Sequence, residues 1–253
     1  MNILIIGDIY SKSGRDVLKK HLNNIVAKNN IDFVVANAEN ISHGKGINKN
    51  HYNFLKQLKV DVITSGNHIF KVKETQEFII ETNDLLRPLN MYESLPGKGT
   101  VLFEKNGFKI RITNLLGTTF MDHANSPFEV LDKLLENDNS DIHIVDFHAE
   151  ASAEKIAFAW NYDGKISALV GTHTHVQTAD ERILPKGTAF ITDIGMTGPI
   201  NSIIGANPDE VIYKEKTGLP TKFIPSENAG KLQAVIIRFE NKKAKSIERI
   251  QVI

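Results

Sequence analysis

The chain has 253 residues, 41% of them hydrophobic, which is enough to bury the core of one large domain. Thirty basic residues balance thirty acidic ones, so the chain lacks the overall positive charge typical of proteins that bind duplex nucleic acid or an anionic membrane. The absence of cysteine excludes disulfides, thiolate metal ligands and a cysteine nucleophile, and because it suits a reducing compartment we expect a cytoplasmic protein.

The first quarter of the chain alternates apolar runs with segments of helical spacing. Apolar runs at 3–6, 33–38 and 60–65 predict strands, and helices are predicted between them over 15–29 and 49–58. The first run begins without a basic leader, so we expect no processing, and no later stretch approaches the roughly 20 apolar residues of a membrane span. The strand–helix–strand order predicts a parallel sheet with right-handed crossovers.

The rest of the chain mixes hairpins with further strands and helices. Runs at 101–104 and 108–116 flank Lys105-Asn106-Gly107 and predict a hairpin. Other runs predict helices over 127–136 and 152–160, strands over 141–148, 168–170 and 188–193, and a C-terminal hairpin over 231–240 and 244–252. Gly and Pro in 194–228 predict an extended, partly irregular loop region, with 200–226 as a candidate interface or lid. The sum is one α/β domain, residues 1–253, with mixed sheets and outer helices.

Four polar clusters directly follow predicted strands. They are Gly7-Asp8, Glu39-Asn40, Gly66-Asn67-His68 and Gly171-Thr172-His173-Thr174-His175. In open α/β folds the crevice beyond the carboxyl ends of the strands is where ligands bind. Together with His148, these clusters supply the imidazole nitrogens and the carboxylate or amide oxygens that a hydrolytic metal pair needs. If the last cluster is extended, His173 and His175 lie on the same side, roughly 6 to 7 Å apart.

Each cluster taken alone also has a structural explanation. Asp8 fits the N-cap of the helix that follows it, and Asn67 fits a left-handed turn after Gly66. Two histidines at one strand end, by contrast, have few structural uses. The conjunction of all the clusters in chain order is far more specific than any single one and favours a metal site.

In their order these clusters resemble the calcineurin-like metallophosphoesterase superfamily and, within it, the YmdB-type phosphodiesterases. The resemblance spans essentially the whole chain and rests on Gly7-Asp8-Ile9, Ala38-Glu39-Asn40, Ser65-Gly66-Asn67-His68, Asp146-Phe147-His148-Ala149-Glu150, the run from Gly171 to Asp180, and the run from Thr192 to Gly198. It implies a two-sheet α/β sandwich with the site at the carboxyl ends of the strands. It also implies two metals: Asp8, Asn40 and His175 would hold one, Asn67, His148 and His173 the other, and Glu39 would bridge them.

Two positions depart from the wider superfamily. Tyr10 stands where the first motif usually has a ligand histidine, and Glu39 replaces the usual bridging aspartate. Both departures match the YmdB-type subgroup, in which an asparagine like Asn40 completes the first metal's shell. Because this shell is rich in oxygen, we expect iron first and manganese next as the two metals per chain, with zinc or magnesium as alternatives.

The resemblance implies a hydrolase of small phosphodiesters, with 2',3'-cyclic or 3',5'-cyclic nucleotides as the leading substrates. In this hypothesis a metal-bridging hydroxide attacks phosphorus, and His68 protonates the leaving alkoxide as the general acid. His68 also fits a residue that only orients a ligand. His43 and Arg15 are candidate substrate contacts, although Arg15 fits an exposed helix start equally well.

Two other functions remain open at this point. A phosphomonoesterase or protein phosphatase is the alternative within the enzymes, and a metal-stabilised regulatory protein that binds partners without turnover is the alternative outside them. The neutral charge argues against long nucleic acid as the main substrate but leaves short RNA ends. The family resemblance also implies a homo-oligomer.

Overall fold

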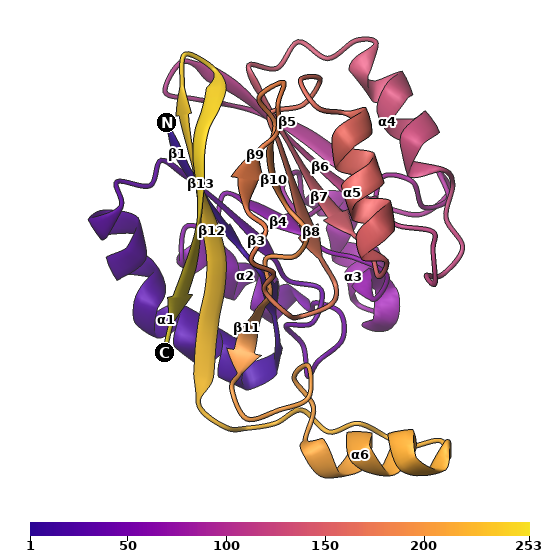
Figure 1. The fold of residues 1–253 in the computed structure, drawn as a ribbon. Coiled ribbons are helices and arrows are strands. Elements are labelled where there is room, and N and C mark those ends of the chain that lie inside the picture. The colour runs from indigo at the N-terminus through magenta and orange to yellow at the C-terminus, as the bar shows by residue number, and fades with distance from the viewer.

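Two β-sheets face each other in the computed structural model, which describes residues 1–253 (Figure 1). The first sheet has the order β2 (Asp8–Ile9), β11 (Met196–Pro199), β12 (Gly230–Glu240), β1 (Asn2–Ile6), β3 (Phe33–Asn37) and β4 (Val62–Thr64), with β13 (Lys243–Val252) paired to β12. The second has the order β5 (Thr100–Lys105), β6 (Phe108–Leu116), β7 (Ile142–His148), β8 (Ala168–Thr172), β10 (Ala189–Ile191) and β9 (Arg182–Ile183).

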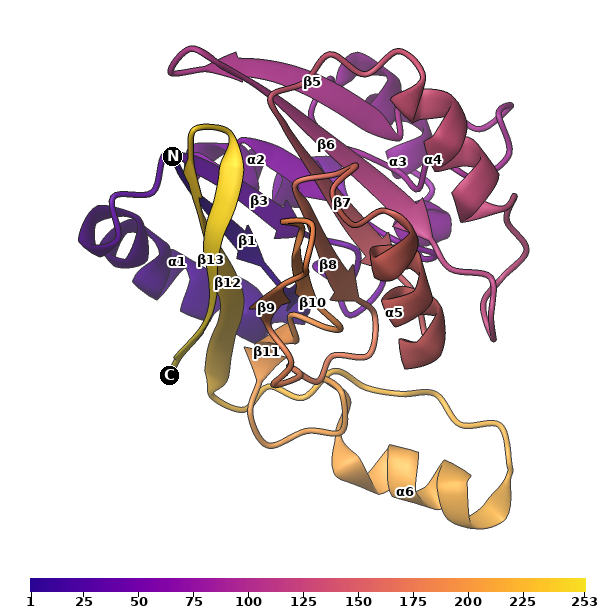
Figure 2. The same cartoon turned by 45° about the horizontal axis from the view of Figure 1, so that its top comes forward.

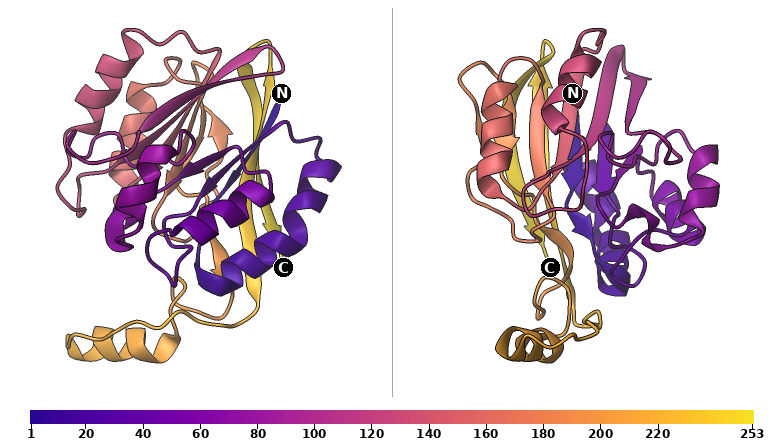
Figure 3. Two further views of the ribbon diagram at one scale, coloured as in Figure 1. Left: turned by 180° about the vertical axis from the view of Figure 1, so that it is seen from behind. Right: turned by 90° about the vertical axis from the view of Figure 1, so that its right-hand side faces the viewer.

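Helices cover the outer face of each sheet (Figures 2 and 3). The first sheet carries α1 (Ser11–Lys28), α2 (Lys49–Gln57), α3 (Thr75–Phe78) and the short 3-10 turns η1 (Ile69–Lys71) and η2 (Ile79–Glu81), and the second carries α4 (Pro127–Leu135) and α5 (Ser152–Asn161). The expected two-sheet α/β fold with outer helices is therefore confirmed. None of these helices combines the length and the apolar character needed to cross a bilayer.

The buried apolar residues form three clusters in successive layers, because both faces of the central strands are covered. In β1, Leu4 and Ile6 pack against the helices, whereas Ile3 and Ile5 pack against the second sheet. Alternate residues of a strand point to opposite faces, so an unbroken apolar run of this kind is typical of a strand covered on both sides.

Parallel strands bring the polar strand ends to one side of the molecule. β1, β3 and β4 are parallel to one another, as are β6, β7, β8 and β10, while β12 runs antiparallel to β1. The sheets are thus mixed, as expected, and the carboxyl ends of both parallel sets face the same region. Any chemistry carried by the residues that follow these strands is gathered there.

Residues 200–229 form an arm that lies beyond this edge and contains α6 (Pro208–Thr217) (Figure 1). The stretch 194–228, expected to be an extended and partly irregular loop region, also contains β11 and a ten-residue helix that were not predicted. The helix has ordinary end signals: Pro208 in its first turn, with acidic residues beside it, and Gly218 as a left-handed C-cap. These signals predict α6 when they are read together.

Candidate metal centre and substrate pocket

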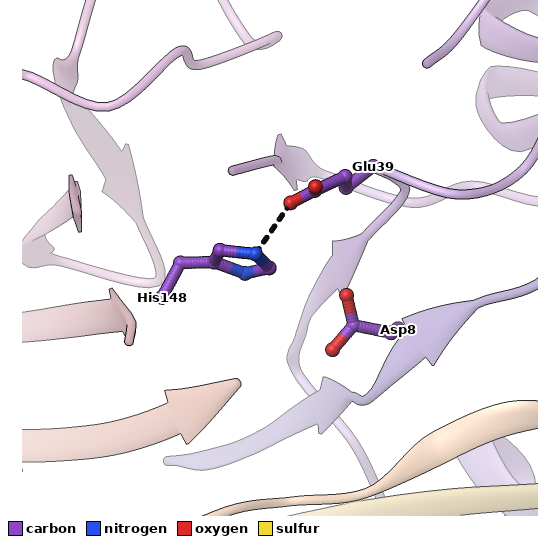
Figure 4. A group of neighbouring side chains, drawn as sticks. All are labelled: Asp8, Glu39 and His148. Carbon is purple, nitrogen blue, oxygen red and sulfur yellow. Dashed lines mark ion pairs between the residues drawn. The ribbon is translucent and has the colours of Figure 1, made fainter. Parts of the chain in front are cut away.

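Asp8, Glu39 and His148 converge between the two sheets (Figure 4). Asp8 begins β2, Glu39 lies just after β3 and His148 ends β7, and all three side chains are fully buried. One ligand atom from each residue lies within 4.8 Å of the others, and Glu39 Oε2 is 2.7 Å from His148 Nε2. We call these three residues the carboxylate–histidine cluster.

A chain of hydrogen bonds fixes which nitrogen of His148 faces the cluster. The Thr172 hydroxyl donates to Asp146 Oδ1 at 2.7 Å, and Thr172 Oγ1 lies 2.9 Å from His148 Nδ1. Because the hydroxyl proton is used by Asp146, Thr172 accepts from the Nδ1–H group of His148. Nε2 is then the nitrogen of His148 that faces Glu39, and a metal would replace its proton there; a ligand histidine held through its other nitrogen is the arrangement found in metal sites.

His173 and His175 repeat this arrangement. His175 Nδ1 donates to the carbonyl of Ile204 at 2.8 Å, which leaves Nε2 facing Asp8 Oδ1 at 3.8 Å. His173 Nε2 lies 3.2 Å from Glu150, and its Nδ1 lies 3.0 Å from His148 Nε2. Each of the three histidines therefore has one nitrogen engaged outside the cluster and the other turned toward it.

The backbone after β8 is not extended, so the reason given for the pairing of His173 and His175 is wrong. β8 ends at Thr172, and the two histidines have φ values of 101° and 64°. Non-glycine residues rarely adopt these left-handed conformations, and they persist only where the surroundings impose them. Both side chains still reach the cluster, but by a tight turn rather than by strand alternation.

Lys155 and Asp193 hold this turn in place. Lys155 lies in α5 with no exposed surface, and its Nζ donates to the Thr172 carbonyl at 2.9 Å and to Asp193 Oδ2 at 2.8 Å. The same carboxylate oxygen accepts from the backbone N–H and the hydroxyl of Thr174. The sequence offers no signal for this contact, because the two residues that clamp the turn are 38 positions apart.

Asn67, Asn40 and Gly66 complete the surroundings of the cluster. Asn67 Oδ1 is buried without a hydrogen-bond donor, and Asn40 Nδ2 lies 3.1 Å from His175 Nε2. Rotating the Asn40 amide by 180° exchanges its nitrogen for its oxygen, so the amide can also present its oxygen, a metal ligand, on the side of His175. A Cβ atom at Gly66 would collide with Glu39 Oε2 and the His148 ring, so only glycine fits there. A buried, unpartnered amide oxygen on the residue after Gly66, together with two buried carboxylates and three imidazoles, is the kind of donor set that a transition-metal site uses.

Charges in the cluster strongly influence one another. Burial raises the pKa of Asp8, although the nearby His175 and His148 offset part of this effect. Burial would also raise the pKa of Glu39, but the charges and hydrogen bonds of His148 and His68 outweigh it and hold that pKa well below its usual range. Burial opposes charge on His148 too, yet Glu39 prevails and raises its pKa to about 9. Two carboxylates buried side by side, Asp8 and Glu39, are stabilised in their charged forms by a cation bound between them.

A pocket of about 440 Å³ opens beside the cluster, and His68 lies on its wall. His68 Nδ1 is 2.9 Å from Glu39 Oε1, and the His68 side chain is 25% exposed. The same carboxylate oxygen accepts the backbone N–H of His68 at 3.0 Å. No protein group engages His68 Nε2, so this nitrogen is available to a molecule in the pocket.

The two candidate substrate contacts lie elsewhere. Arg15 donates to the carbonyl of Ile41 at 2.6 Å, His43 is exposed on a loop, and neither lines the pocket. Lys45, two residues after His43, does line it and has no acidic partner. Its position between Gly44 and Gly46 is the signal in the sequence for a loop that approaches a ligand closely, and both glycines have positive φ. Tyr10 also lines the pocket, with its ring edge-on to His175 at 5.7 Å between centroids.

Comparison with known proteins gives the family. The family model described as YmdB-like protein matches residues 4–250. The chain belongs to the YmdB-like family. The family-level resemblance is thereby confirmed, and it extends over nearly the whole sequence. Among curated YmdB-like relatives, the chain is 44% identical over 256 residues to a Bacillus subtilis (strain 168) protein named 2',3'-cyclic-nucleotide 2'-phosphodiesterase, with 100% of this chain and 97% of that protein covered.

Solved structures agree with this YmdB-like assignment. A structure from Mycoplasma pneumoniae, described as a novel phosphatase, has a TM-score of 0.96 at 42% identity and covers 100% of this chain and 93% of its own. A structure of a hypothetical protein from Thermus thermophilus has a TM-score of 0.95 at 37% identity, with 100% and 99% covered. The fold described above is therefore shared along its full length.

Proposed function

We propose that the chain is a metal-dependent phosphodiesterase that hydrolyses small phosphodiesters, with 2',3'-cyclic or 3',5'-cyclic nucleotides as the leading substrates. The observation that carries this proposal is the common orientation of His148, His173 and His175, each with one nitrogen engaged and the other turned toward buried Asp8 and Glu39. The name of the Bacillus relative supports a cyclic phosphodiester as the substrate.

The buried carboxylates and imidazole of the cluster fit a metal site, and two metal ions, iron or manganese, would be held there. Seven side chains would hold them: Asp8, Asn40 and His175 at one position, Asn67, His148 and His173 at the other, and Glu39 between the two. When bound, divalent cations neutralise phosphate charge and lower the pKa of water. The carboxylates and imidazoles are immobilised by their own partners, so little reorganisation is needed on binding.

The protein's own groups then orient the substrate and move the proton. Lys45, at the pocket wall, would bind a phosphate oxygen by charge. His68 would donate a proton from Nε2 to the leaving oxygen while Glu39 holds its Nδ1–H. A positioned general acid of this kind contributes about 10² to 10⁴-fold in rate.

The test is hydrolysis of a substrate panel by protein supplied with manganese or iron. The panel contains bis-p-nitrophenyl phosphate, p-nitrophenyl phosphate and the 2',3'-cyclic and 3',5'-cyclic nucleotides. Faster hydrolysis of diesters than of the monoester supports the proposal, and a preference for the monoester would favour a phosphatase instead. The cytoplasmic location and the homo-oligomer stay predictions. Size-exclusion chromatography with light scattering would measure the oligomeric state.

A further inference from the structure

One part of the pocket wall is apolar and comes from the arm. It consists of Ile203, Ile204, Ala206, Val211 and Phe223. Ala206 and Val211 are nearly buried, whereas Ile204 is 53% exposed and Phe223 38% exposed. A pocket lined by apolar side chains together with a few polar groups is the usual form of a small-molecule site.

Ile204 occupies a conformation that isoleucine disfavours. Ile203 and Ala206 exchange both backbone hydrogen bonds, which makes Ile204-Gly205 the centre of a tight turn. Both central residues have positive φ, 46° and 107°, and turns of this kind prefer Asn-Gly. A β-branched residue there is a genuine outlier, and such outliers cluster at ligand sites. The turn alone does not explain an isoleucine at this position.

The same turn contacts His175, which lies beside the cluster. The Ile204 carbonyl accepts the Nδ1–H of His175, so its backbone supports a proposed metal ligand while the residue lines the pocket. Gly205 lies against the Tyr10 ring, where a Cβ atom would be only 2.7 Å from three ring carbons. The position of Ile204 relative to the cluster is therefore fixed by contacts on both sides.

We propose that Ile204 and Phe223 form an apolar subsite that receives the nucleobase of a nucleoside phosphodiester whose phosphate lies at the carboxylate–histidine cluster. This inference rests on the proposed function and deepens it, because it assigns substrate selectivity to the arm. The pocket volume of about 440 Å³ is within the range of small-molecule sites. One face of the Phe223 ring is covered by Lys214, whose Nζ lies 5.1 Å from the ring centroid, which restrains the ring for contact with a base.

The test compares two cyclic diesters that differ in the base. The quantity measured is the selectivity, the ratio of kcat/KM for adenosine 2',3'-cyclic monophosphate to kcat/KM for glycerol 1,2-cyclic phosphate. Ile204→Asn keeps a residue that accepts positive φ and keeps the carbonyl that binds His175, but removes the apolar side chain. We expect the selectivity to fall roughly tenfold in Ile204→Asn and in Phe223→Ala, the size usual for a lost apolar contact in a pocket.

Ile224→Asn is the matched control, since Ile224 is in the same arm, is 50% exposed and lies outside the pocket. It should keep the wild-type selectivity. Relief of backbone strain should also leave the Tm of Ile204→Asn unchanged or about 2 to 4 °C higher. Wild-type selectivity in Ile204→Asn, or an equal fall in Ile224→Asn, would overturn the subsite.

A binding measurement separates this inference from the proposed function. Calorimetric titration with adenosine 3'-monophosphate needs no turnover, and we expect roughly tenfold weaker binding by Ile204→Asn than by the wild type. If the wild-type protein hydrolyses neither diester, the proposed function is wrong, and equal affinities of wild type and Ile204→Asn for the nucleotide would then reject the subsite as well. Hydrolysis of both diesters with unchanged selectivity rejects the subsite alone.

Discussion

The ammonium of Lys155 lies 2.8 Å from a carboxylate oxygen of Asp193, and both side chains are shielded from solvent. Lys155→Met leaves the carboxylate buried without its cation, and breaking a buried pair in this way costs about 3 to 5 kcal/mol of unfolding free energy. Urea denaturation measures this loss. Lys12→Met, which breaks an ion pair exposed on α1, is the control and should cause no comparable change. Equal stability of the two variants would contradict a clamping role for Lys155.

Thr172→Val should weaken metal binding without changing the shape of the strand. It removes the oxygen that accepts from His148 Nδ1, so the imidazole loses the contact that fixes its tautomer. Loss of such a support typically costs 10- to 100-fold in metal affinity. Competition titration with manganese measures it. Thr113→Val is a close control, because the Thr113 hydroxyl makes a contact of the same length, 2.9 Å, with Nε2 of the buried His143 away from the site. A similar affinity in both variants would reject the orienting role.

Gly66→Ala should prevent metal binding while leaving the sheets intact. The added methyl group would occupy the space between Glu39 Oε2 and the His148 ring, and one of these two side chains must move. Metal content by elemental mass spectrometry, with circular dichroism as the check on folding, measures the effect. Gly107→Ala adds a methyl group to an open hairpin turn and should keep its metal. Full metal content in Gly66→Ala would show that Glu39 and His148 do not define the site.

His68→Ala should keep both metals while turnover falls about 10² to 10⁴-fold. The reason is that His68 faces the pocket with Nε2 and is absent from the proposed ligand set. Steady-state kinetics and metal content are measured on the same sample, with exposed His123→Ala as the control. Loss of metal from His68→Ala would make this residue a ligand or the support of one.

Acid should destabilise the protein partly through His51. Burial, together with the charges of Arg15 and His43, lowers the pKa of His51 to about 4 from an ordinary value of 6.5. Between these values the unfolded chain binds a proton that the folded chain does not, so the stability contributed by neutral His51 is complete above pH 6.5 and is lost as the pH falls toward 4. The unfolding free energy of His51→Gln should therefore fall less steeply between pH 7 and 4.5. Parallel curves for the two proteins would contradict this assignment.

The strands and the order of the polar clusters could be predicted from sequence because each depends on local pattern. Ile3 to Ile6 forms a strand that is buried on both faces, and Asp8 and Glu39 follow strands at the expected edge. The left-handed backbone at His173 and His175 could not be predicted, because it is imposed by Lys155 and Asp193 through tertiary contacts. Strand alternation predicts that His173 and His175 lie together, but a tight turn after β8 brings them together instead.

The substrate side of the site was harder to predict than the metal side. The Gly-rich turn predicts His43 as a substrate contact, yet Lys45 is the residue of that turn with a charged side chain that lines the pocket. A one- or two-residue shift in a turn reverses which side chain points inward, and turn geometry depends on what packs against it. The apolar wall of the arm was missed for the same reason, since Ile204 and Phe223 meet the cluster only through the fold.

Anomalous diffraction from crystals grown with saturating manganese would detect a pair of metal ions at the strand ends. We expect two peaks roughly 3.5 to 4 Å apart on either side of Glu39, one beside Asp8 and His175 and the other beside His148 and His173. A single peak, or none within reach of these side chains, would contradict the dinuclear site and the hydrolytic function built on it.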